Sequence, residues 1–389
     1  MTEAAGEQSH TEGWNTYAEK NQSHAEGKET QALGNAAHSE GYGTSAEGNN
    51  SHAEGYATRA FEHNSHAEGY ETQANGASSH TEGRETKTES SYAHAEGYKT
   101  TASGQQSHAE GYKTIASENQ SHAEGKETQA NGNASHSEGD KTIASGIASH
   151  AEGYKSVASG YGSHAEGGCN VDENNIYQGG TASGHSSHAE GQQTIAEGDA
   201  SHTEGYNTYA SHAQAHAEGD STQALHYNTH AEGKSTIAKG ENSHAEGLGT
   251  ETTNINEHAQ GQYNISNPDK TIHSVGIGTS KERKNAHEIT NDGKHYILGV
   301  GGYDGTNPSD TNDVATTIKN LEENASGSTT SFYFKKVRGN FESIHLNIAD
   351  IDNTEGTSLD ELGITESQEE MLNLICMTRF SDSEFTDLY

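Results

Sequence analysis

The segment Ser23-His24-Ala25-Glu26-Gly27 recurs, with small variations, between Ser9 and Gly261. Its histidine is present in eighteen copies, which lie fourteen residues apart except for one step of 24 residues from His164 to His188. A short, fixed period indicates a solenoid, in which each turn buries its core only against neighbouring turns. The repeated histidines are His10, His24, His38, His52, His66, His80, His94, His108, His122, His136, His150, His164, His188, His202, His216, His230, His244 and His258.

Each repeat contains two segments in which small residues alternate with larger ones. In the first segment Ser23, Ala25 and Gly27 share one face, while His24 and Glu26 share the other. The second segment, Thr30-Gln31-Ala32-Leu33-Gly34, places Thr, Ala and Gly on one face. Alternation with period two is typical of short strands. We therefore predict an all-β fold, a parallel β-roll solenoid with fourteen residues per turn and small residues inside.

The composition agrees with a narrow core. Only 41 of the 389 residues are Leu, Ile, Val or Phe, and 13 of these lie in residues 1–261. A conventional apolar core is therefore expected only toward the C-terminus. The net charge of −36 argues against nucleic-acid binding, because phosphates require a basic surface. The chain has no run of eighteen apolar residues and no apolar N-terminal segment, so neither membrane insertion nor a classical secretion signal is expected.

The face that carries histidine and glutamate is constant along the repeats. Glutamate follows the histidine in seventeen copies, and Gln260 replaces it in the last. The outward positions of the second segment vary freely, as at Tyr17, Gln31, Arg59 and Ile115. A constant pair of bulky polar residues predicts a buried surface, which we assign to the interface of a parallel oligomer of this chain. The glutamates assigned to the oligomer axis are Glu26, Glu54, Glu68, Glu96, Glu110, Glu124, Glu152 and Glu166.

The alternation of Ser-x-Ala-x-Gly and Thr-x-Ala-x-Gly at fourteen residues resembles the head of trimeric autotransporter adhesins, the YadA-like left-handed β-roll. The resemblance covers residues 9–261. It implies a homotrimer in which the outward positions of the first strand pack around a threefold axis. That family usually carries aliphatic residues at these positions, whereas this chain carries His and Glu.

Eighteen histidines beside carboxylates raise the question of catalysis or metal binding. The array is uniform along the chain and contains no unique constellation, so no enzymatic activity is expected. Three inward histidines per layer could bind Zn²⁺ or Ni²⁺, but each histidine has a glutamate two residues away as a ready partner. We therefore assign neither a metal nor another cofactor. Pairing with glutamate should raise the histidine pKa, unless desolvation outweighs it.

Two further features interrupt or decorate the repeat. Ten extra residues lie within residues 168–180, and such an insertion forms either a binding loop or a tolerated bulge. Tyrosine often follows the glycine of the motif, as at Tyr42, Tyr56 and Tyr70. This residue is interpreted as a turn residue that stacks on its neighbours, with a sugar-binding aromatic ladder as the alternative.

The fourteen-residue periodicity ends at Tyr263. Strands are predicted at residues 271–280, 285–290 and 295–300, with a hairpin turn at 291–293. A helix that begins near residue 310 carries a short heptad seam for chain alignment, formed by Val314, Ile318 and Leu321. Further strands are predicted at 332–334 and 344–348, and a helix from about Glu366. The predicted domains are a shaft (1–262), a strand region (263–309), a short coiled-coil helix (310–326) and an α+β tip or connector (327–389).

The segment after Tyr263 is similar to C-terminal regions of bacteriophage tail-fibre proteins. Together the two resemblances imply a homotrimeric structural fibre, most simply a phage tail fibre or similar virion appendage that attaches to a host surface. Its expected partners are a host cell-surface receptor and a tail or baseplate protein. The alternative is a bacterial cell-surface adhesin of the trimeric autotransporter type. The expected location is the virion or an extracellular surface.

Overall fold

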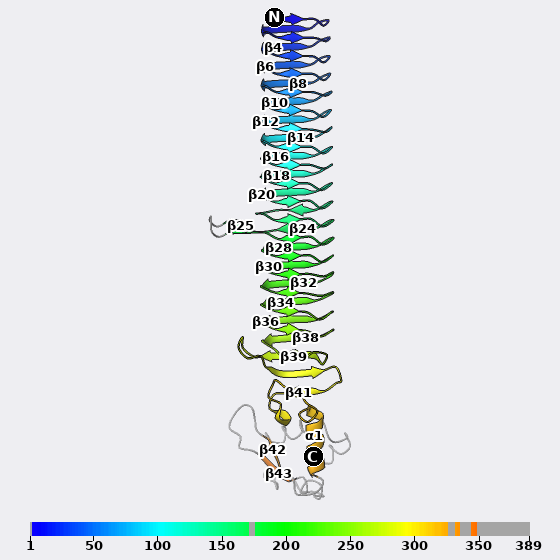
Figure 1. Cartoon of the computed structure of the whole chain (residues 1–389), viewed down its shortest axis with the longest axis vertical. Coiled ribbons are helices and arrows are strands. Elements are labelled where there is room, and N and C mark those ends of the chain that lie inside the picture. Colours follow the sequence, from blue (N-terminus) through cyan, green and yellow to red (C-terminus); the bar gives the residue numbers. More distant parts are fainter. Residues whose placement is uncertain (1, 171–175, 326–330, 335–343, 348–389) are drawn as a thin grey trace, which may run out of the picture. The chain divides into compact units, whose positions relative to one another are not determined.

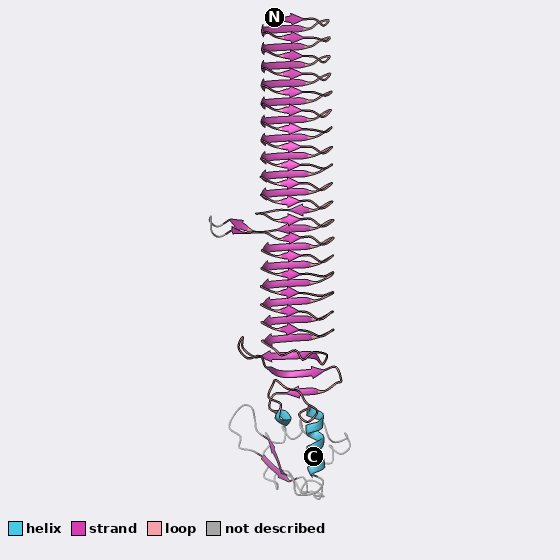
Figure 2. Ribbon diagram, in the orientation of Figure 1, coloured by secondary structure: helices cyan, strands magenta, loops and turns pink. Residues whose placement is uncertain are grey.

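The computed structural model describes residues 2–170, 176–325, 331–334 and 344–347. The chain forms two compact units, Met1–Val314 and Ala315–Tyr389 (Figure 1). The first unit is a parallel β-solenoid, as predicted, in which every turn adds one strand to each of two sheets (Figure 2). No helix among the described residues is long and apolar enough to span a membrane.

The first sheet of the solenoid holds the Ser-His-Ala-Glu-Gly segments, mostly as five-residue strands. Successive strands pair in parallel with identical residues opposite one another, so that His24 faces His38 and Gly27 faces Gly41. The strands are β2 (His10–Trp14), β4 (His24–Lys28), β6 (His38–Tyr42), β8 (His52–Tyr56), β10 (His66–Tyr70), β12 (His80–Arg84), β14 (His94–Tyr98), β16 (His108–Tyr112), β18 (His122–Lys126), β20 (His136–Asp140), β22 (His150–Ala151), β24 (His164–Glu166), β28 (His188–Gln192), β30 (His202–Tyr206), β32 (His216–Asp220), β34 (His230–Lys234), β36 (His244–Leu248) and β38 (His258–Gln262).

The second sheet is narrower than the sequence predicts. Of the segment Thr30–Gly34, only Gln31 and Ala32 form a strand, since the chain turns on either side of them. The strands of this sheet are β1 (Glu3–Ala4), β3 (Tyr17–Ala18), β5 (Gln31–Ala32), β7 (Ser45–Ala46), β9 (Arg59–Ala60), β11 (Gln73–Ala74), β13 (Lys87–Thr88), β15 (Thr101–Ala102), β17 (Ile115–Ala116), β19 (Gln129–Ala130), β21 (Ile143–Ala144), β23 (Val157–Ala158), β27 (Thr181–Ala182), β29 (Ile195–Ala196), β31 (Tyr209–Ala210), β33 (Gln223–Ala224), β35 (Ile237–Ala238) and β37 (Glu251–Thr252).

Small residues fill the space between the two sheets. Ala25, Thr30 and Ala32 have no solvent exposure, and Ser23 has almost none. The predicted inward face of both segments is therefore confirmed. Because these side chains are short, the two sheets approach closely, and the remaining side chains of each strand must point outward.

Glycine is required where successive turns come closest. Gly27 has a φ of +111°, and a Cβ atom there would collide with the carbonyl oxygen of Gly41 on the next turn. The same relationship recurs along the column of motif glycines. Only a residue without a side chain fits both the backbone conformation and this distance.

The described residues of the insertion form a pair of short strands at the side of the solenoid, which we call the side hairpin (Figure 1). Its described strands, β25 (Cys169–Asn170) and β26 (Ile176–Tyr177), pair in an antiparallel arrangement. The solenoid itself continues without a shift, because β24 pairs directly with β28 and His164 lies opposite His188.

The solenoid ends in an antiparallel sheet at the predicted place. Strand β39 (Thr271–Ile277) pairs in parallel with β38, and β40 (Asn285–Thr290) and β41 (His295–Ile297) follow in antiparallel order. The third strand is shorter than predicted, because the 3₁₀ turn η1 (Val300–Gly302) follows it. The predicted turn at 291–293 contains Gly293 with a φ of +80°.

The helix α1 (Val314–Ala325) confirms the predicted helix, although it begins four residues later than expected. Ile318 and Leu321, two members of the predicted seam, are about half exposed in the single chain. Strands β42 (Ser331–Phe334) and β43 (Ile344–Asn347) form an antiparallel pair at the predicted positions. The predicted helix from about Glu366 lies outside the described residues.

Candidate functional site: a ladder of histidine and glutamate

The eighteen repeated histidines form one continuous column, which we call the histidine ladder. From His24 to His258, consecutive rings lie 4.4–5.0 Å apart between centroids, with planes within 18° of parallel. Only the first contact, from His10 to His24, is edge-on. The strand spacing of roughly 4.8 Å sets this separation, so the sheet itself stacks the rings.

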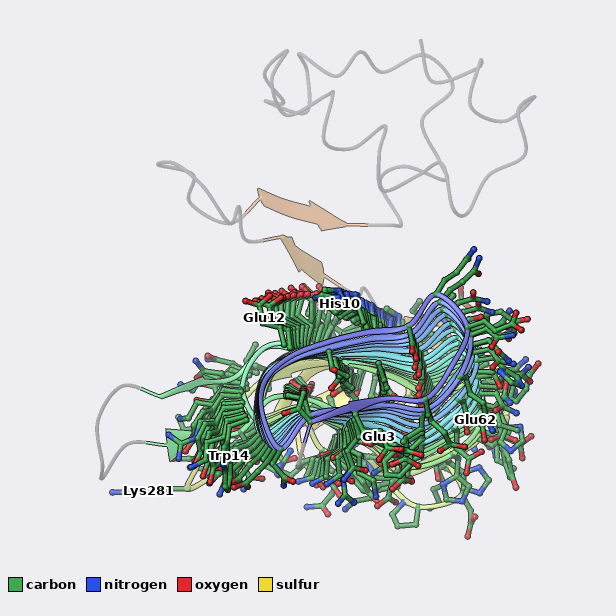
Figure 3. All side chains as sticks on the ribbon, turned by 90° about the horizontal axis from the view of Figure 1, so that it is seen from above. Glu3, His10, Glu12, Trp14, Glu62 and Lys281 are labelled. Carbon is green, nitrogen blue, oxygen red and sulfur yellow. The ribbon has the colours of Figure 1, made fainter. Side chains whose placement is uncertain are left out.

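The glutamates form a second column on the same face. Figure 3, a view along the solenoid, shows His10 and Glu12 side by side on one flat face, with Glu3 on the opposite side. The ladder histidines that pair with a glutamate retain 34–41 % of their side-chain exposure, so the face is partly open to solvent in a single chain. The structure thus gathers all predicted axial residues on one surface.

The pairing of histidine with glutamate is looser than the sequence suggests. In the ladder histidines that pair with a glutamate, Nε2 lies 3.5–3.9 Å from the glutamate oxygen, as in His122 with Glu124 at 3.8 Å and His136 with Glu138 at 3.5 Å. From His24 onward, every ladder Nε2 is shielded from solvent and has no hydrogen-bond partner among the described residues. The glutamate is therefore a neighbour of the ring and not its hydrogen-bonding partner.

The histidine pKa follows the second of the two expectations, in which desolvation outweighs pairing with glutamate. Burial lowers the pKa of His52, His66, His108 and His136, and the neighbouring histidines lower it further. The pKa of His230 falls to about 4 for the same two reasons. Nearby glutamates act in the opposite direction but more weakly. Desolvation therefore outweighs ion pairing, and these rings are neutral near neutral pH.

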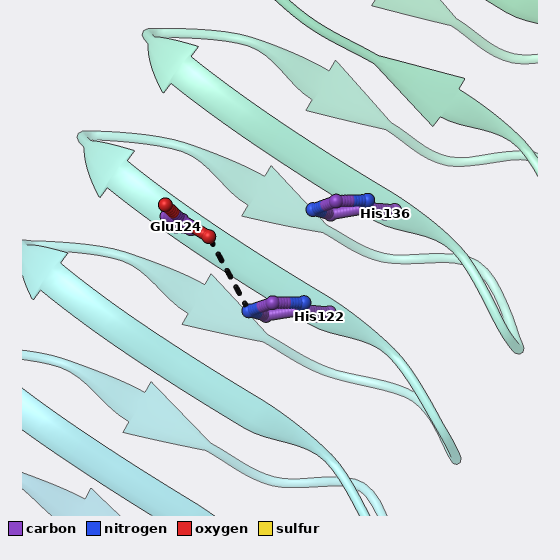
Figure 4. A group of neighbouring side chains, drawn as sticks. All are labelled: His122, Glu124 and His136. Carbon is purple, nitrogen blue, oxygen red and sulfur yellow. Dashed lines mark ion pairs between the residues drawn. The ribbon is translucent and has the colours of Figure 1, made fainter.

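Groups of two ladder histidines and one glutamate could hold a metal ion. In each group the ligand atoms lie within 4.8 Å of one another. Figure 4 shows one of them, in which His122 and His136 lie parallel and Glu124 lies beside His122. Other groups centre on Glu138, Glu152, Glu218 and Glu232.

The tyrosines after the motif glycine form a separate stack. The rings of Tyr42, Tyr56 and Tyr70 lie 4.8–5.1 Å apart and nearly parallel. The ammonium group of Lys28 lies between Trp14 and Tyr42, at 5.1 and 4.9 Å from their ring centroids. Neighbouring side chains thus cover the ring faces, which confirms the stacking interpretation.

Two buried carboxylates at the end of the solenoid were missed from the sequence. Glu288 accepts hydrogen bonds from Asn267, Thr271, Asn285 and Tyr303 at 2.7–3.2 Å, and it has no solvent exposure. Glu257 accepts four hydrogen bonds on Oε2, while burial raises the pKa of its carboxyl group. A signal for Glu257 was present, since it occupies the position that a small residue holds in the other repeats.

Comparison with known proteins supports the resemblance of the repeats. The sequence model of the YadA head domain repeat matches residues 95–117, 137–163 and 178–201. No curated protein matches the chain. No match supports the predicted resemblance of the C-terminal segment to phage tail fibres. The YadA head is a structural, adhesin-type fold, and it is trimeric in the adhesins that carry it. The solenoid therefore contains repeats of the YadA head type, which point to an adhesin-like fibre.

Proposed function

We propose that this chain forms a homotrimeric, adhesin-like fibre at an extracellular surface, with the histidine and glutamate faces of three solenoids turned toward a common axis. One observation carries the proposal. This face keeps the same two residues over almost the whole solenoid, although the side chains are only partly buried in a single chain. The exposed side of the second sheet varies from turn to turn. When the same residues recur at one surface position in every turn, that surface is expected to contact a partner that repeats with the same period.

The YadA-type repeats support a trimer, because YadA heads are trimeric in adhesins. The regular register of the first sheet keeps this face flat along the solenoid, so that three copies could remain in contact over its length. In α1, Val314, Ile318 and Leu321 would align the three chains as a short coiled coil.

In this proposal the function is attachment. The variable outward positions and the side hairpin would contact a receptor on another cell or surface, while the core supplies only stiffness. Nothing beyond the resemblance favours a virion, in which a tail or baseplate protein would anchor the fibre. We therefore propose the broader function of a surface adhesin.

The test is the mass of the full-length protein by multi-angle light scattering. We expect three times the chain mass of 41.3 kDa. Three aspartates placed in the ladder should weaken the trimer, because they add charge at the axis. Three aspartates on the opposite sheet of the same turns should leave the trimer intact. The ladder variant is His94→Asp, His108→Asp and His122→Asp, and the control is Thr101→Asp, Ile115→Asp and Gln129→Asp.

Circular dichroism must show that both variants retain the β-solenoid. A wild-type monomer would contradict the proposal. So would two variants that dissociate equally, because the ladder face would then have no special role.

A further inference from the structure

We propose that pairs of successive ladder histidines, together with the glutamate beside them, bind divalent transition-metal ions such as Zn²⁺. The observation behind this proposal is the group His122, Glu124 and His136, which recurs along the solenoid (Figure 4). All three ligands come from one chain, so the donor set does not depend on the proposed trimer.

The donor chemistry fits a borderline transition ion. Imidazole nitrogen and carboxylate oxygen together suit Zn²⁺, Cu²⁺ and Ni²⁺, whereas Ca²⁺ and Mg²⁺ prefer oxygen ligands alone. Each group offers two nitrogens and one oxygen, which leaves a fourth position for water or for a ligand from another chain.

The nitrogens are available for a metal. The Nε2 atoms of His122 and His136 are shielded from solvent and lack a hydrogen-bond partner among the described residues. Buried polar atoms are normally paired, so an unpaired nitrogen repeated in every turn from His24 to His258 calls for a partner.

The spacing of the ladder limits how many ions can bind. The rings of His122 and His136 are 4.7 Å apart, whereas two ligand atoms on a tetrahedral Zn²⁺ lie about 3.4 Å apart. Two neighbouring rings must therefore tilt toward each other to share an ion. A ring that tilts toward one neighbour moves away from the other, so each histidine can serve one ion only. The ladder should accept at most one ion for every two histidines.

The charge of the face also favours cations. Seventeen of the eighteen repeats place a glutamate on this face, and no lysine or arginine occupies the two outward positions of the motif. If three such faces meet at an axis, as the proposed function requires, three columns of carboxylates come together. Bound metal ions would offset that charge, and this part of the argument rests on the proposed trimer.

The experiment is calorimetric titration of the full-length protein with Zn²⁺ after treatment with EDTA and dialysis. We expect several ions per chain, no more than half the number of ladder histidines. With Co²⁺ as a probe, visible absorption should report nitrogen and oxygen ligands. A ladder variant with glutamine at six consecutive positions should lose one third of the ions, since it removes six of eighteen histidines. The substitutions are His94→Gln, His108→Gln, His122→Gln, His136→Gln, His150→Gln and His164→Gln.

The matched control replaces histidines outside the ladder, at His63, His185, His212 and His226, with glutamine. Of these, His212 and His226 also stack, 5.2 Å apart, but their Nδ1 atoms already bond to Ser211 and to the backbone of Tyr227. This control should bind as many ions as the wild type. Zn²⁺ uptake by the ladder variant equal to that of the wild type would overturn the proposal. Equal uptake of Ca²⁺ and Zn²⁺ would also overturn it, because that result indicates a merely acidic surface.

Light scattering on the same samples separates this proposal from the trimer. A monomer that binds Zn²⁺ with the expected stoichiometry would overturn the proposed function and support the metal site. A trimer that binds no Zn²⁺ would overturn the metal site alone.

Discussion

The ring of His108 lies parallel to the ring of His122, with centroids 4.7 Å apart and planes 2° apart. A proton on one ring therefore meets a like charge if the next ring is also protonated. Burial lowers the pKa of His108, His122 and His94 lower it further, and Glu96 and Glu124 act in the opposite direction. Protonation of His108 is consequently disfavoured in the folded stack.

This resistance predicts that acid destabilises the solenoid. An unfolded histidine has a pKa of about 6.5. Below that pH the unfolded chain therefore binds more protons than the folded chain, whose histidines with a lowered pKa stay neutral. Stability should be fully present above about pH 6.5 and should fall as the pH drops toward the folded values, of which that of His230 is about 4. Melting temperatures measured by circular dichroism between pH 8 and about pH 4.5, with EDTA present, will test this. A melting temperature that rises on acidification would mean that the ladder is stabilised by ion pairs.

The motif glycine should not tolerate a side chain. A Cβ at Gly41, where φ is +112°, would collide with the carbonyl oxygen of Gly55. We expect Gly41→Ala to lower the free energy of unfolding by roughly 2–4 kcal/mol, from backbone strain and overpacking together. The control is Gly43→Ala, where φ is +65° and nothing lies within 4 Å of the added atom. Ala57, one turn later, adopts the same left-handed conformation with φ +54°. The free energy of unfolding of the control, measured by urea denaturation, should therefore fall by at most about 1 kcal/mol.

The side-chain hydroxyl groups of the core threonines should contribute unequally to stability. The Oγ1 atom of Thr100 is buried without a hydrogen-bond partner among the described residues, whereas that of Thr142 bonds to Ser137 and to the Glu138 carbonyl at 2.8 and 3.0 Å. Thr142→Val should therefore lower the free energy of unfolding by about 1–2 kcal/mol. Thr100→Val should be neutral or stabilising, since it removes an unpaired polar atom. Equal losses for the two variants in chemical denaturation would show that the hydroxyl contacts are unimportant.

The carboxylate of Glu288 should hold the end of the solenoid together. Glu288→Gln would place an amide donor at one of the two oxygen positions, where it meets a group that already donates: Thr271 at Oε1, 2.7 Å away, or Tyr303 at Oε2, 2.8 Å away. We expect this substitution to lower the local free energy of unfolding by about 2–3 kcal/mol. The change should be measurable as faster amide hydrogen exchange in β39, β40 and β41. The control, Glu282→Gln, changes an exposed carboxylate in the same region and should leave exchange unchanged. If both variants exchange alike, the buried network does not stabilise this end.

The repeat made most of the fold predictable. Fourteen-residue spacing and the alternation around His24 and Ala32 fix which residues face inward, because a strand alternates strictly and one turn resembles the next. The face that carries histidine and glutamate follows from the same alternation. The trimer axis itself stays a prediction, since it depends on contacts that a single chain does not contain.

Features that depend on distances between turns could not be predicted from the sequence. The sequence predicts a raised histidine pKa only if pairing with glutamate outweighs desolvation, and it does not decide between them. In the structure burial and the neighbouring histidines lower the pKa of His108. The role of Glu288 was also hidden, because its partners Asn267 and Tyr303 lie 21 and 15 residues away in irregular sequence. No periodicity relates these three residues, so no pattern could bring them together.

The side hairpin leaves the solenoid between β24 and β28, yet His164 and His188 still stack 4.8 Å apart with planes 2° apart. The scaffold thus accommodates ten additional residues without a change in its register. This turn is therefore a natural acceptor for foreign sequence: a peptide exchanged for the hairpin would be displayed at a fixed height along a rigid rod. The displayed sequence could then diversify independently of the architecture that carries it.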